Sequence, residues 1–309
     1  MRKQLGYEAL ENRSMLTATF SGGAVQVSVN NQDVKIVKDF DKALVYVDNT
    51  EVEIKDAGGN STDVYLGEVE QINITISGNE GNTVDLTDVI PIDFVSIGAI
   101  GTGPCAYDAI FVTLGGGNDT YVPGGYGGMI NGGAGNDTIN GGPRTERVFA
   151  GSGNDIVHGG GGCDLIQGEG GADELYGDGG DDQIWGGSDN DHIYGGDGAD
   201  QLFGDAGHDW LYGGNNNDTM AGGTGNDHLY GQAGHDKLED TDDNDVDYLY
   251  GGADNDIINL YDLDFDDYAI GGDGQDAFLL DGEAIGGYLF GDSDHNDFDP
   301  LVDLIIYFI

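Results

Sequence analysis

Aspartate recurs every ninth residue through the middle of this chain, and these carboxylates are the groups best placed to do chemistry. If Asp is position 6 of a nine-residue unit, residues 114–239 divide into fourteen contiguous units and the frame never slips. Position 6 is Asp in twelve units, Glu146 in one and Gly128 in one. Carboxylates held at a fixed spacing offer the oxygen ligands that hard divalent cations prefer. The spacing therefore predicts a series of cation sites.

The overall composition also favours cations as the binding partner. The chain has 58 acidic and 10 basic residues, which gives a formal net charge of −48. That charge argues against nucleic acid or an anionic membrane as a partner. No stretch approaches the roughly 18 uncharged apolar residues of a membrane-spanning helix, so no membrane span is expected.

Position 8 of the unit is apolar in all fourteen copies, and glycine is concentrated near the start of the unit. The unit thus resembles the RTX, or hemolysin-type, calcium-binding repeat, G-G-x-G-x-D-x-U-x, in which U is apolar. The resemblance covers residues 114–239 strictly and extends more loosely to about residue 290. It implies Ca²⁺ as the ion and an all-β fold. In this parallel β-roll, or β-solenoid, each unit is half a coil, made of a glycine-rich turn and a three-residue strand.

Elementary strand geometry agrees with this fold. In a strand of positions 7–9, position 8 lines a thin core while positions 7 and 9 face outward. Glycine supplies the positive φ angles that tight turns need. Ordering so much glycine costs roughly 1–2 kcal/mol per residue, which a thin core cannot offset. Bound cations are therefore expected to hold the turns, and the roll is expected to fold when they bind.

Two units make one coil of such a roll, so turns 18 residues apart stack on the same edge at roughly 4.8 Å. Carboxylates stacked at that distance repel each other unless a cation lies between them. Backbone carbonyls of the turns would complete an all-oxygen coordination, which favours Ca²⁺ over Mg²⁺ and transition metals. One edge carries Asp119, Asp137, Asp155, Asp173, Asp191, Asp209 and Asp227. The other carries Asp164, Asp182, Asp200, Asp218 and Asp236, after Gly128 and Glu146 in its first two places.

Three later units have eleven residues instead of nine, at 240–250, 260–270 and 280–290. They alternate with nine-residue units, so all three insertions fall on the edge that contains Asp119. If the frame is anchored on the strands, Asp247 and Asp267 continue that edge, and Asp256 and Asp276 continue the other. These four residues complete the predicted set of metal ligands.

The regions on either side of the repeats are expected to form separate parts of the molecule. Segments 24–30, 34–38, 43–47, 52–55 and 71–77 alternate apolar and polar residues between turn residues, which predicts β-strands. The segment at 78–87 looks like a decayed unit, so the roll is expected to begin near Val64. The predicted organisation is a sorting-like segment at 1–20, a β-rich region at 21–105, the roll at 106–290 and a final segment at 291–309.

Both chain ends contain features of exported proteins. Tyr7, Glu8, Leu10, Glu11, Arg13, Met15 and Leu16 resemble an N-terminal sorting motif of exported bacterial surface proteins. The apolar segment at 300–309 is predicted to be a strand that caps the open end of the roll. The alternative is an uncleaved C-terminal secretion signal, because Asp303 is followed by three apolar residues. Localisation is therefore expected to be extracellular or at the cell surface.

Sequence signatures of catalysis are missing. No His is followed by Glu, and no serine stands in G-x-S-x-G, so the zinc-protease and lipase motifs are absent. The histidines of the repeats, such as His208 and His235, are expected to be solvated. We therefore expect no enzyme, with no catalytic residues and no cofactor besides Ca²⁺. The alternative is a secreted enzyme whose catalytic site lies in residues 20–105 without a known motif.

One surface feature suggests a further partner. Position 9 on one sheet reads Tyr176, Tyr194, Tyr212, Tyr230 and, in the extended frame, Tyr250. These side chains are predicted to form an outward-facing tyrosine ladder. Tyrosine is common in strands for structural reasons alone. The alternative is an adhesin that uses this surface to contact a glycan or a protein.

The chain has two cysteines, Cys105 and Cys163. If the nonapeptide frame is extended backwards, they lie three coils apart on the same edge, or about 14 Å at roughly 4.8 Å per coil. A disulfide needs Cα atoms closer than about 7 Å. The frame therefore predicts two free thiols. Overall, the sequence predicts a calcium-binding β-roll with a structural or interaction role that folds when Ca²⁺ binds.

Overall fold

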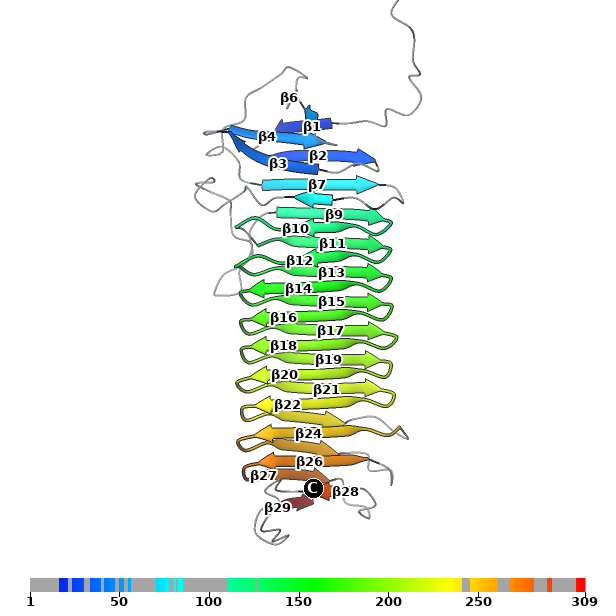
Figure 1. Ribbon diagram of the computed structural model, residues 1–309, viewed down its shortest axis with the longest axis vertical. Helices are drawn as coiled ribbons and strands as arrows, with labels where there is room; N and C mark the ends of the chain where they lie inside the picture. The colour runs from blue at the N-terminus through cyan, green and yellow to red at the C-terminus, as the bar shows by residue number, and fades with distance from the viewer. Residues whose placement is uncertain are drawn as a thin grey trace, which may run out of the picture.

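The molecule is an all-β solenoid with parallel sheets, as the repeat predicted (Figure 1). The computed structural model describes residues 17–21, 24–30, 34–39, 42–47, 50–52, 55–56, 71–77, 81, 83–85, 110–125, 127–240, 245–260, 267–280, 288–290 and 304–308. None of these segments forms a helix that could cross a lipid bilayer.

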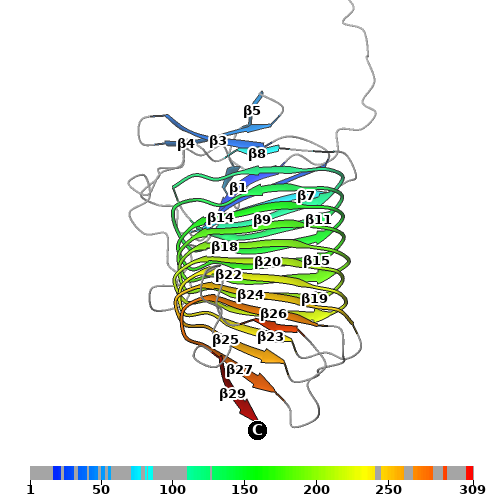
Figure 2. The ribbon, with the colours of Figure 1, turned by 60° about the horizontal axis from the view of Figure 1, so that its bottom comes forward.

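Two sheets form the opposite walls of the roll, and the chain alternates between them (Figures 1 and 2). Within the roll, sheet 1 contains β9 (Ile110–Gly116), β11 (Met129–Ala134), β13 (Arg147–Ser152), β15 (Leu165–Gly170), β17 (Gln183–Ser188), β19 (Gln201–Ala206), β21 (Thr219–Thr224), β23 (Lys237–Asp240), β25 (Ile257–Leu260), β27 (Asp276–Leu280) and β29 (Leu304–Phe308). Sheet 2 contains β10 (Thr120–Val122), β12 (Thr138–Asn140), β14 (Ile156–Gly161), β16 (Glu174–Gly179), β18 (His192–Asp197), β20 (Trp210–Asn215), β22 (His228–Ala233), β24 (Tyr248–Ala253), β26 (Tyr268–Asp273) and β28 (Tyr288–Phe290).

The register of each sheet follows the nonapeptide period. Ile166 pairs with Ile184, and Ile184 pairs with Leu202, so one coil takes 18 residues. The strands are longer than the predicted three residues. In the regular part they run from position 7 to position 3 of the next unit, as in β15, whose pairing with β17 extends to Gly170 and Ser188. The glycine-rich start of each unit thus belongs to the sheet, and the turn is confined to the middle of the unit.

The core is a single column of apolar side chains between the two sheets. In the regular coils every position-8 residue is fully buried, for example Ile166, Leu175 and Ile184, each at 0% exposure. Position 1 is the other inward position of the strand, and it is occupied mainly by glycine. The core is therefore only one large side chain deep at each strand, as the repeat predicted.

The N-terminal strands pack on the start of the roll. The predicted strands are present as β2 (Ala24–Asn30), β3 (Val34–Asp39), β4 (Lys42–Val47) and β7 (Gln71–Ser77). The segment predicted as one strand at 52–55 instead contributes to β5 (Thr50–Val52) and β6 (Lys55–Asp56), and β1 (Thr17–Ser21) pairs with β2.

The roll itself begins before residue 110. Strand β7 pairs in parallel with β9, and β8 (Thr83–Asp85), inside the decayed unit at 78–87, pairs in parallel with β10. Ile72 is 38 residues from its partner Ile110, and Thr83 is 37 residues from its partner Thr120. The 18-residue period is therefore interrupted between this coil and the next.

The last described strand, β29, completes sheet 1 at the C-terminal end. Leu304 pairs with Asp276 and Phe308 pairs with Leu280, both in parallel register. The prediction of a C-terminal strand at the end of the roll is thus confirmed.

Candidate metal-binding edges

The position-6 aspartates form two continuous hydrogen-bonded ladders along the roll. Edge 1 is the row of turns that leads from sheet 1 to sheet 2, and edge 2 is the row that leads back. The backbone N–H of Asp173 donates to Oδ1 of Asp191 in the next coil at 2.8 Å, and that of Asp191 donates to Asp209 at 2.8 Å. The same bond joins successive coils from Asp119 to Asp267 on edge 1 and from Glu146 to Asp276 on edge 2.

These ladders confirm the predicted grouping of the aspartates. Asp247 and Asp267 join edge 1, and Asp256 and Asp276 join edge 2, although their hydrogen bonds span 20 residues instead of 18. Anchoring the frame on the strands was therefore the correct treatment of the eleven-residue units. Each eleven-residue unit joins a strand of sheet 1 to the next strand of sheet 2, as predicted for edge 1.

In twelve of these aspartates the second carboxylate oxygen is buried without a hydrogen-bond partner. The side chains are almost fully buried; Asp191, Asp209 and Asp227 have 0% exposure. The atoms without a partner are Oδ2 of Asp137, Asp155, Asp164, Asp173, Asp182, Asp191, Asp200, Asp209, Asp218, Asp227, Asp236 and Asp256. A buried carboxylate oxygen is costly unless it is paired or coordinates a metal, so a row of them marks sites for a positive ligand.

The first glycine of each unit makes room for this oxygen. A Cβ at Gly159 would lie 2.5 Å from Oδ2 of Asp164, in the same unit. The same collision occurs between Gly177 and Asp182. Position 1 faces inward, so the carboxylate of position 6 occupies the space where the side chain of position 1 would otherwise lie. The Gly and Asp of the motif are thus required together.

Burial strongly disfavours the charged form of these carboxyl groups. Burial, reinforced by the neighbouring carboxylates of the same edge and only partly opposed by the backbone N–H bond, raises the pKa of Asp182 and Asp191 to about 8. Burial is also the main reason why the pKa of Asp137 rises to about 7 and that of Asp200 to about 6. To fold near neutral pH, these carboxyl groups must therefore either take up protons or be neutralised by a cation.

Backbone oxygens lie near the unpartnered carboxylates: a Cβ at Gly168 would lie 2.4 Å from Oδ2 of Asp173 and 2.5 Å from the carbonyl oxygen of Gly186. A Cβ at Gly135 or Gly153 would collide with the carbonyl oxygen of the equivalent residue one coil earlier, so these oxygens point along the edge. In the described turns no hydrogen bond ends on the carbonyl oxygens of Gly135, Gly153 or Gly171. No three His, Cys, Asp or Glu side chains converge in the described part of the chain. A cation at these edges would therefore take a few carboxylate oxygens and several carbonyl oxygens, a donor set that suits Ca²⁺.

The turns also contain an outer ladder that sequence reasoning missed. The backbone N–H of Asn136 donates to Oδ1 of Asn118 at 2.9 Å, so position 5 links coils beside position 6. His208 takes the same role, because its Nδ1 accepts from the N–H of Asn226 at 2.8 Å. His235 does so with Asn255 at 3.0 Å. These two histidines are exposed, as predicted, and in addition they link the turns of successive coils. The frequent Asn at position 5 of the unit could have predicted this outer ladder.

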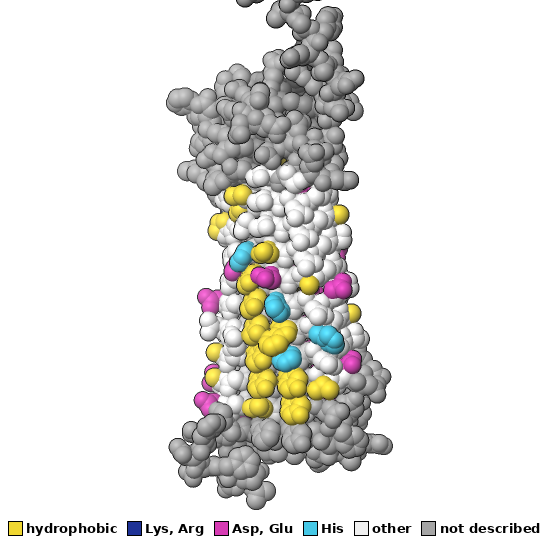
Figure 3. Space-filling model, turned by 45° about the vertical axis from the view of Figure 1, so that its right-hand side comes forward, with side chains coloured by type: hydrophobic (Ala, Val, Ile, Leu, Met, Phe, Trp, Pro, Cys, Tyr) yellow, Lys and Arg dark blue, Asp and Glu magenta, His cyan; other side chains and the backbone are white. Residues whose placement is uncertain are grey.

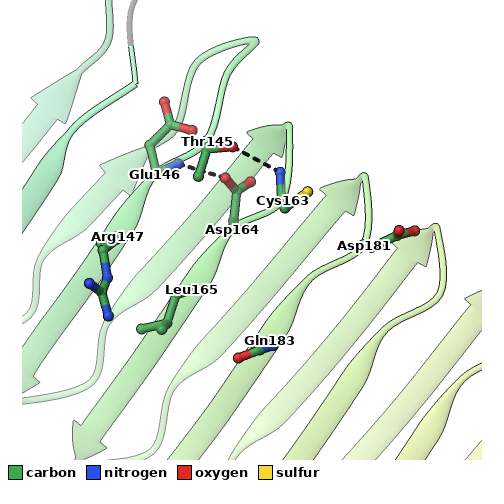
Figure 4. A pocket seen from close by; sticks show the side chains of 8 residues that line it. All are labelled: Thr145, Glu146, Arg147, Cys163, Asp164, Leu165, Asp181 and Gln183. Atoms are coloured by element: carbon green, nitrogen blue, oxygen red, sulfur yellow. Dashed lines mark hydrogen bonds between the residues drawn. The ribbon is translucent and has the colours of Figure 1, made fainter. Parts of the chain in front are cut away.

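The N-terminal end of edge 2 departs from the regular pattern (Figure 4). Glu146 is fully buried, and its Oε1 accepts from the N–H of Gly142 at 2.8 Å. Its N–H donates to Asp164 at 2.7 Å, and the N–H of Cys163 donates to Oγ1 of Thr145 at 3.2 Å. A pocket of about 170 Å³ lies here, lined by Thr145, Glu146, Arg147, Cys163, Asp164, Leu165, Asp181 and Gln183.

The prediction of two free thiols is wrong, because Cys163 is disulfide-bonded. Cys105, the other cysteine of the sequence, lies outside the described residues. The prediction assumed that the nine-residue frame continues backwards from residue 114. The pairing separations of 38 and 37 residues between the coil of β7 and β8 and the next coil show that it does not. Without that frame, the spacing of three coils between the two cysteines has no basis.

The predicted tyrosine ladder is present on sheet 2. The rings of Tyr176, Tyr194, Tyr212, Tyr230 and Tyr250 stack in one row, with centroids 4.7–5.1 Å apart. A second row at position 7 was missed; it contains His192, Trp210, His228, Tyr248 and Tyr268. The nonapeptide frame could have predicted this row too, because its aromatic residues recur at position 7. Figure 3 shows the two rows as adjacent columns of hydrophobic and histidine side chains.

Comparison with known proteins agrees with the geometry. The family model of the RTX calcium-binding nonapeptide repeat matches residues 123–143, 141–175, 149–184, 176–211, 212–246 and 230–262. No curated protein matches the chain. Repeats of this family bind Ca²⁺ at multiple sites, and β-solenoids built from them are typically non-catalytic and typically secreted. Residues 123–262 are therefore RTX calcium-binding nonapeptide repeats, and the β-roll that they build binds Ca²⁺.

Proposed function

We propose that this protein is an extracellular or cell-surface β-roll that folds when Ca²⁺ binds and serves a structural or interaction role. The observation behind this proposal is the double row of buried Oδ2 atoms that have no hydrogen-bond partner. Each row needs positive charge to be stable at neutral pH. Bound Ca²⁺ supplies that charge and shares its coordination between neighbouring coils.

The proposed ligands are the position-6 carboxylates of both edges together with carbonyl oxygens of the turns. They are Asp119, Asp137, Asp155, Asp173, Asp191, Asp209, Asp227, Asp247 and Asp267 on edge 1, and Asp164, Asp182, Asp200, Asp218, Asp236, Asp256 and Asp276 on edge 2. From Asp137 onward on edge 1 and from Asp164 onward on edge 2, Oδ1 accepts a backbone N–H, which fixes the side chain; in the regular coils, as at Asp191 and Asp200, this leaves Oδ2 for the ion. Glu146 is not proposed as a ligand, because its Oε1 satisfies Gly142 within its own turn.

The calcium affinity expected of such modules supports a location outside the cell. Extracellular modules bind Ca²⁺ with Kd values of about 10⁻⁴–10⁻³ M, so the roll would stay unfolded where Ca²⁺ is scarce and fold where it is abundant. This suits export as an unfolded chain. The sorting-like segment at residues 1–20 lies outside the described residues and stays a prediction.

A calcium titration followed by circular dichroism, together with fractionation of the producing cells, tests this proposal. We expect a cooperative gain of β-signal at millimolar Ca²⁺ and recovery of the protein in the surface or culture-medium fraction. A chelated protein with full β-content would contradict Ca²⁺-driven folding. Retention of the whole protein in the cytoplasm would contradict export without affecting the first result.

A further inference from the structure

The two aromatic rows of sheet 2 form one continuous strip on the outer face of the roll. The outward residues at positions 7 and 9 of β18, β20, β22, β24 and β26 are called the aromatic strip below. In the tyrosine row the rings lie nearly parallel, with interplanar angles of 4–8° along Tyr194, Tyr212, Tyr230 and Tyr250. In the other row the rings stack from Trp210 onward, whereas His192 meets Trp210 edge-on at 78°. Trp210 joins the rows through Tyr230, at 6.2 Å. The strip is thus a rigid surface aligned with the axis of the roll.

The centre of this strip is uncharged, although 22% of the whole chain is charged. Strands β20, β22 and β24 read WLYGGN, HLYGQA and YLYGGA, so three successive strands of sheet 2 contain no Asp, Glu, Lys or Arg. The acidic residues of sheet 2 begin on either side of this centre, at Asp197 in β18 and Asp273 in β26. Loss of charge together with enrichment in Tyr and Trp is typical of the centre of a binding surface. A neutral occupant fits such a surface, because the carboxylates around it repel anions.

The strip also has free hydrogen-bonding groups. On β16, one coil before the strip, the hydroxyl of Tyr176 donates to Glu174 at 3.3 Å. Among the described residues, the hydroxyls of Tyr194, Tyr212 and Tyr230 make no hydrogen bond to the protein. Since neighbouring rings cover each other's faces, the strip presents ring edges and a row of hydroxyl groups. This surface combines apolar contact with regularly spaced hydrogen-bond donors and acceptors.

The dimensions of the strip favour a linear polymer over a folded protein. The two rows are about 7 Å apart at roughly 3.3 Å per residue, and the tyrosine row spans about 20 Å at roughly 4.8 Å per coil. The resulting area is a few hundred Å² at most, well below the roughly 800 Å² per partner of a stable protein interface. An extended peptide repeats its side chains at about 6.7 Å, which does not match the coil spacing. An extended glycan has a sugar repeat close to one coil, many hydroxyl groups and no necessary charge.

We propose that the aromatic strip binds a neutral, linear, extended glycan that lies along the axis of the roll. Sugar hydroxyls would exchange hydrogen bonds with successive tyrosine hydroxyls while the sugar C–H groups contact the ring edges. The site exists only in the folded roll, so this inference rests on the proposed Ca²⁺-dependent folding. Circular dichroism of each sample separates a failure to fold from a failure to bind.

The test measures binding of the calcium-loaded full chain to neutral β-1,4-linked hexasaccharides of glucose and of N-acetylglucosamine, by calorimetry. The corresponding disaccharides are measured beside them, because an extended site requires length. One triple variant, Tyr212→Thr/Tyr230→Thr/Tyr250→Thr, removes the rings; a second, with Phe at the same positions, removes only the hydroxyls. Phe203→Thr is the matched control, since Phe203 stacks on Trp185 at 5.3 Å on the outer face of sheet 1.

We expect a hexasaccharide to bind at least about tenfold more tightly than its disaccharide, and the Thr variant to lose at least about tenfold in affinity. The Phe variant should lose about fivefold for each hydroxyl that bonds the sugar. The control should bind like the unmodified protein. Failure of both hexasaccharides to bind, or equal binding by the Thr variant, would overturn the proposal. So would sedimentation of the unmodified protein as a dimer that the Thr variant dissociates, which would assign the strip to self-association.

Discussion

The two edges of the roll are built from the same unit but begin differently. Edge 1 has an aspartate in every coil from Asp119 to Asp267, whereas edge 2 begins with Gly128 and Glu146. At that end of edge 2, one carboxylate oxygen of Glu146 accepts from the N–H of Gly142, and Cys163 is disulfide-bonded. The regular coils of both edges instead contain buried carboxylate oxygens without partners. A coil can therefore be held by a cation between stacked carboxylates, or by local hydrogen bonds and a covalent bond that need no cation.

The largest effect should come from removing Ca²⁺. With excess chelator near neutral pH, residues 132–239 should lose most of their β-signal, because a core one side chain deep cannot offset the stacked charge. Millimolar Ca²⁺ should restore it. Hydrogen exchange should show that peptides at the N-terminal end of edge 2, around residues 141–165, keep more protection than those around Asp191. If both regions stayed fully protected from exchange in chelator, the proposed difference between the two edges would be wrong.

Acidification should replace part of the effect of Ca²⁺. In the folded, cation-free state burial raises the pKa of Asp182, Asp191, Asp218 and Asp227 from 3.8 to about 8. A folded pKa above the unfolded value means that protonation favours folding. The stabilisation is complete below about pH 4 and is lost as the pH rises through about 8.

Chelated protein should therefore regain β-signal at about pH 5.5 and lose it at about pH 8.5, whereas the calcium-loaded protein should change little. Circular dichroism at the two pH values measures this. A chelated protein with the same signal at both values would show that the ladders do not control folding.

Breaking the disulfide should weaken edge 2 locally without removing cation sites. Cys163→Ser should lower the free energy of unfolding in Ca²⁺ by about 2–4 kcal/mol, the usual range for a native disulfide. The number of bound calcium ions should stay the same. Denaturant titration and calorimetry measure the two quantities. In the unmodified protein, alkylation after denaturation without reductant should leave Cys163 unmodified, and complete labelling would contradict the disulfide.

The smallest effects compare one position of each edge. The strict repeats offer six same-edge gaps from Asp119 to Asp227 and four from Asp164 to Asp236, so about ten ions are expected there. Asp191→Ala should lose the sites on both sides of its turn, about 3 kcal/mol when free Ca²⁺ is tenfold above Kd. Glu146→Ala should keep all ions and cost about 1–2 kcal/mol, from the N–H of Gly142 left unpaired. Equal calcium stoichiometry in the two variants would show that the edges are assigned wrongly.

The regular part of the fold was predictable because its contacts repeat with the sequence. A shift of 18 residues places Asp173 beneath Asp191 and Ile166 beside Ile184, so one period determines both the ladder and the core. The places of Asp247 and Asp256 in the two ladders were also predicted correctly once the frame was anchored on the strands. The collision between Gly177 and the Asp182 carboxylate was not predictable, since it depends on where Oδ2 lies in three dimensions.

The sequence by itself determined the two edges, the apolar column and the choice of Ca²⁺, because these follow from residue type and a fixed spacing. Only the tertiary structure decided where the frame stops. Ile72 pairs with Ile110 across 38 residues, and no local pattern announces such a distance. The same break removes the basis of the prediction that Cys163 is free, and Cys163 is in fact disulfide-bonded. Periodicity encodes contacts between equivalent residues, whereas contacts made by non-repeating segments depend on the path of the whole chain.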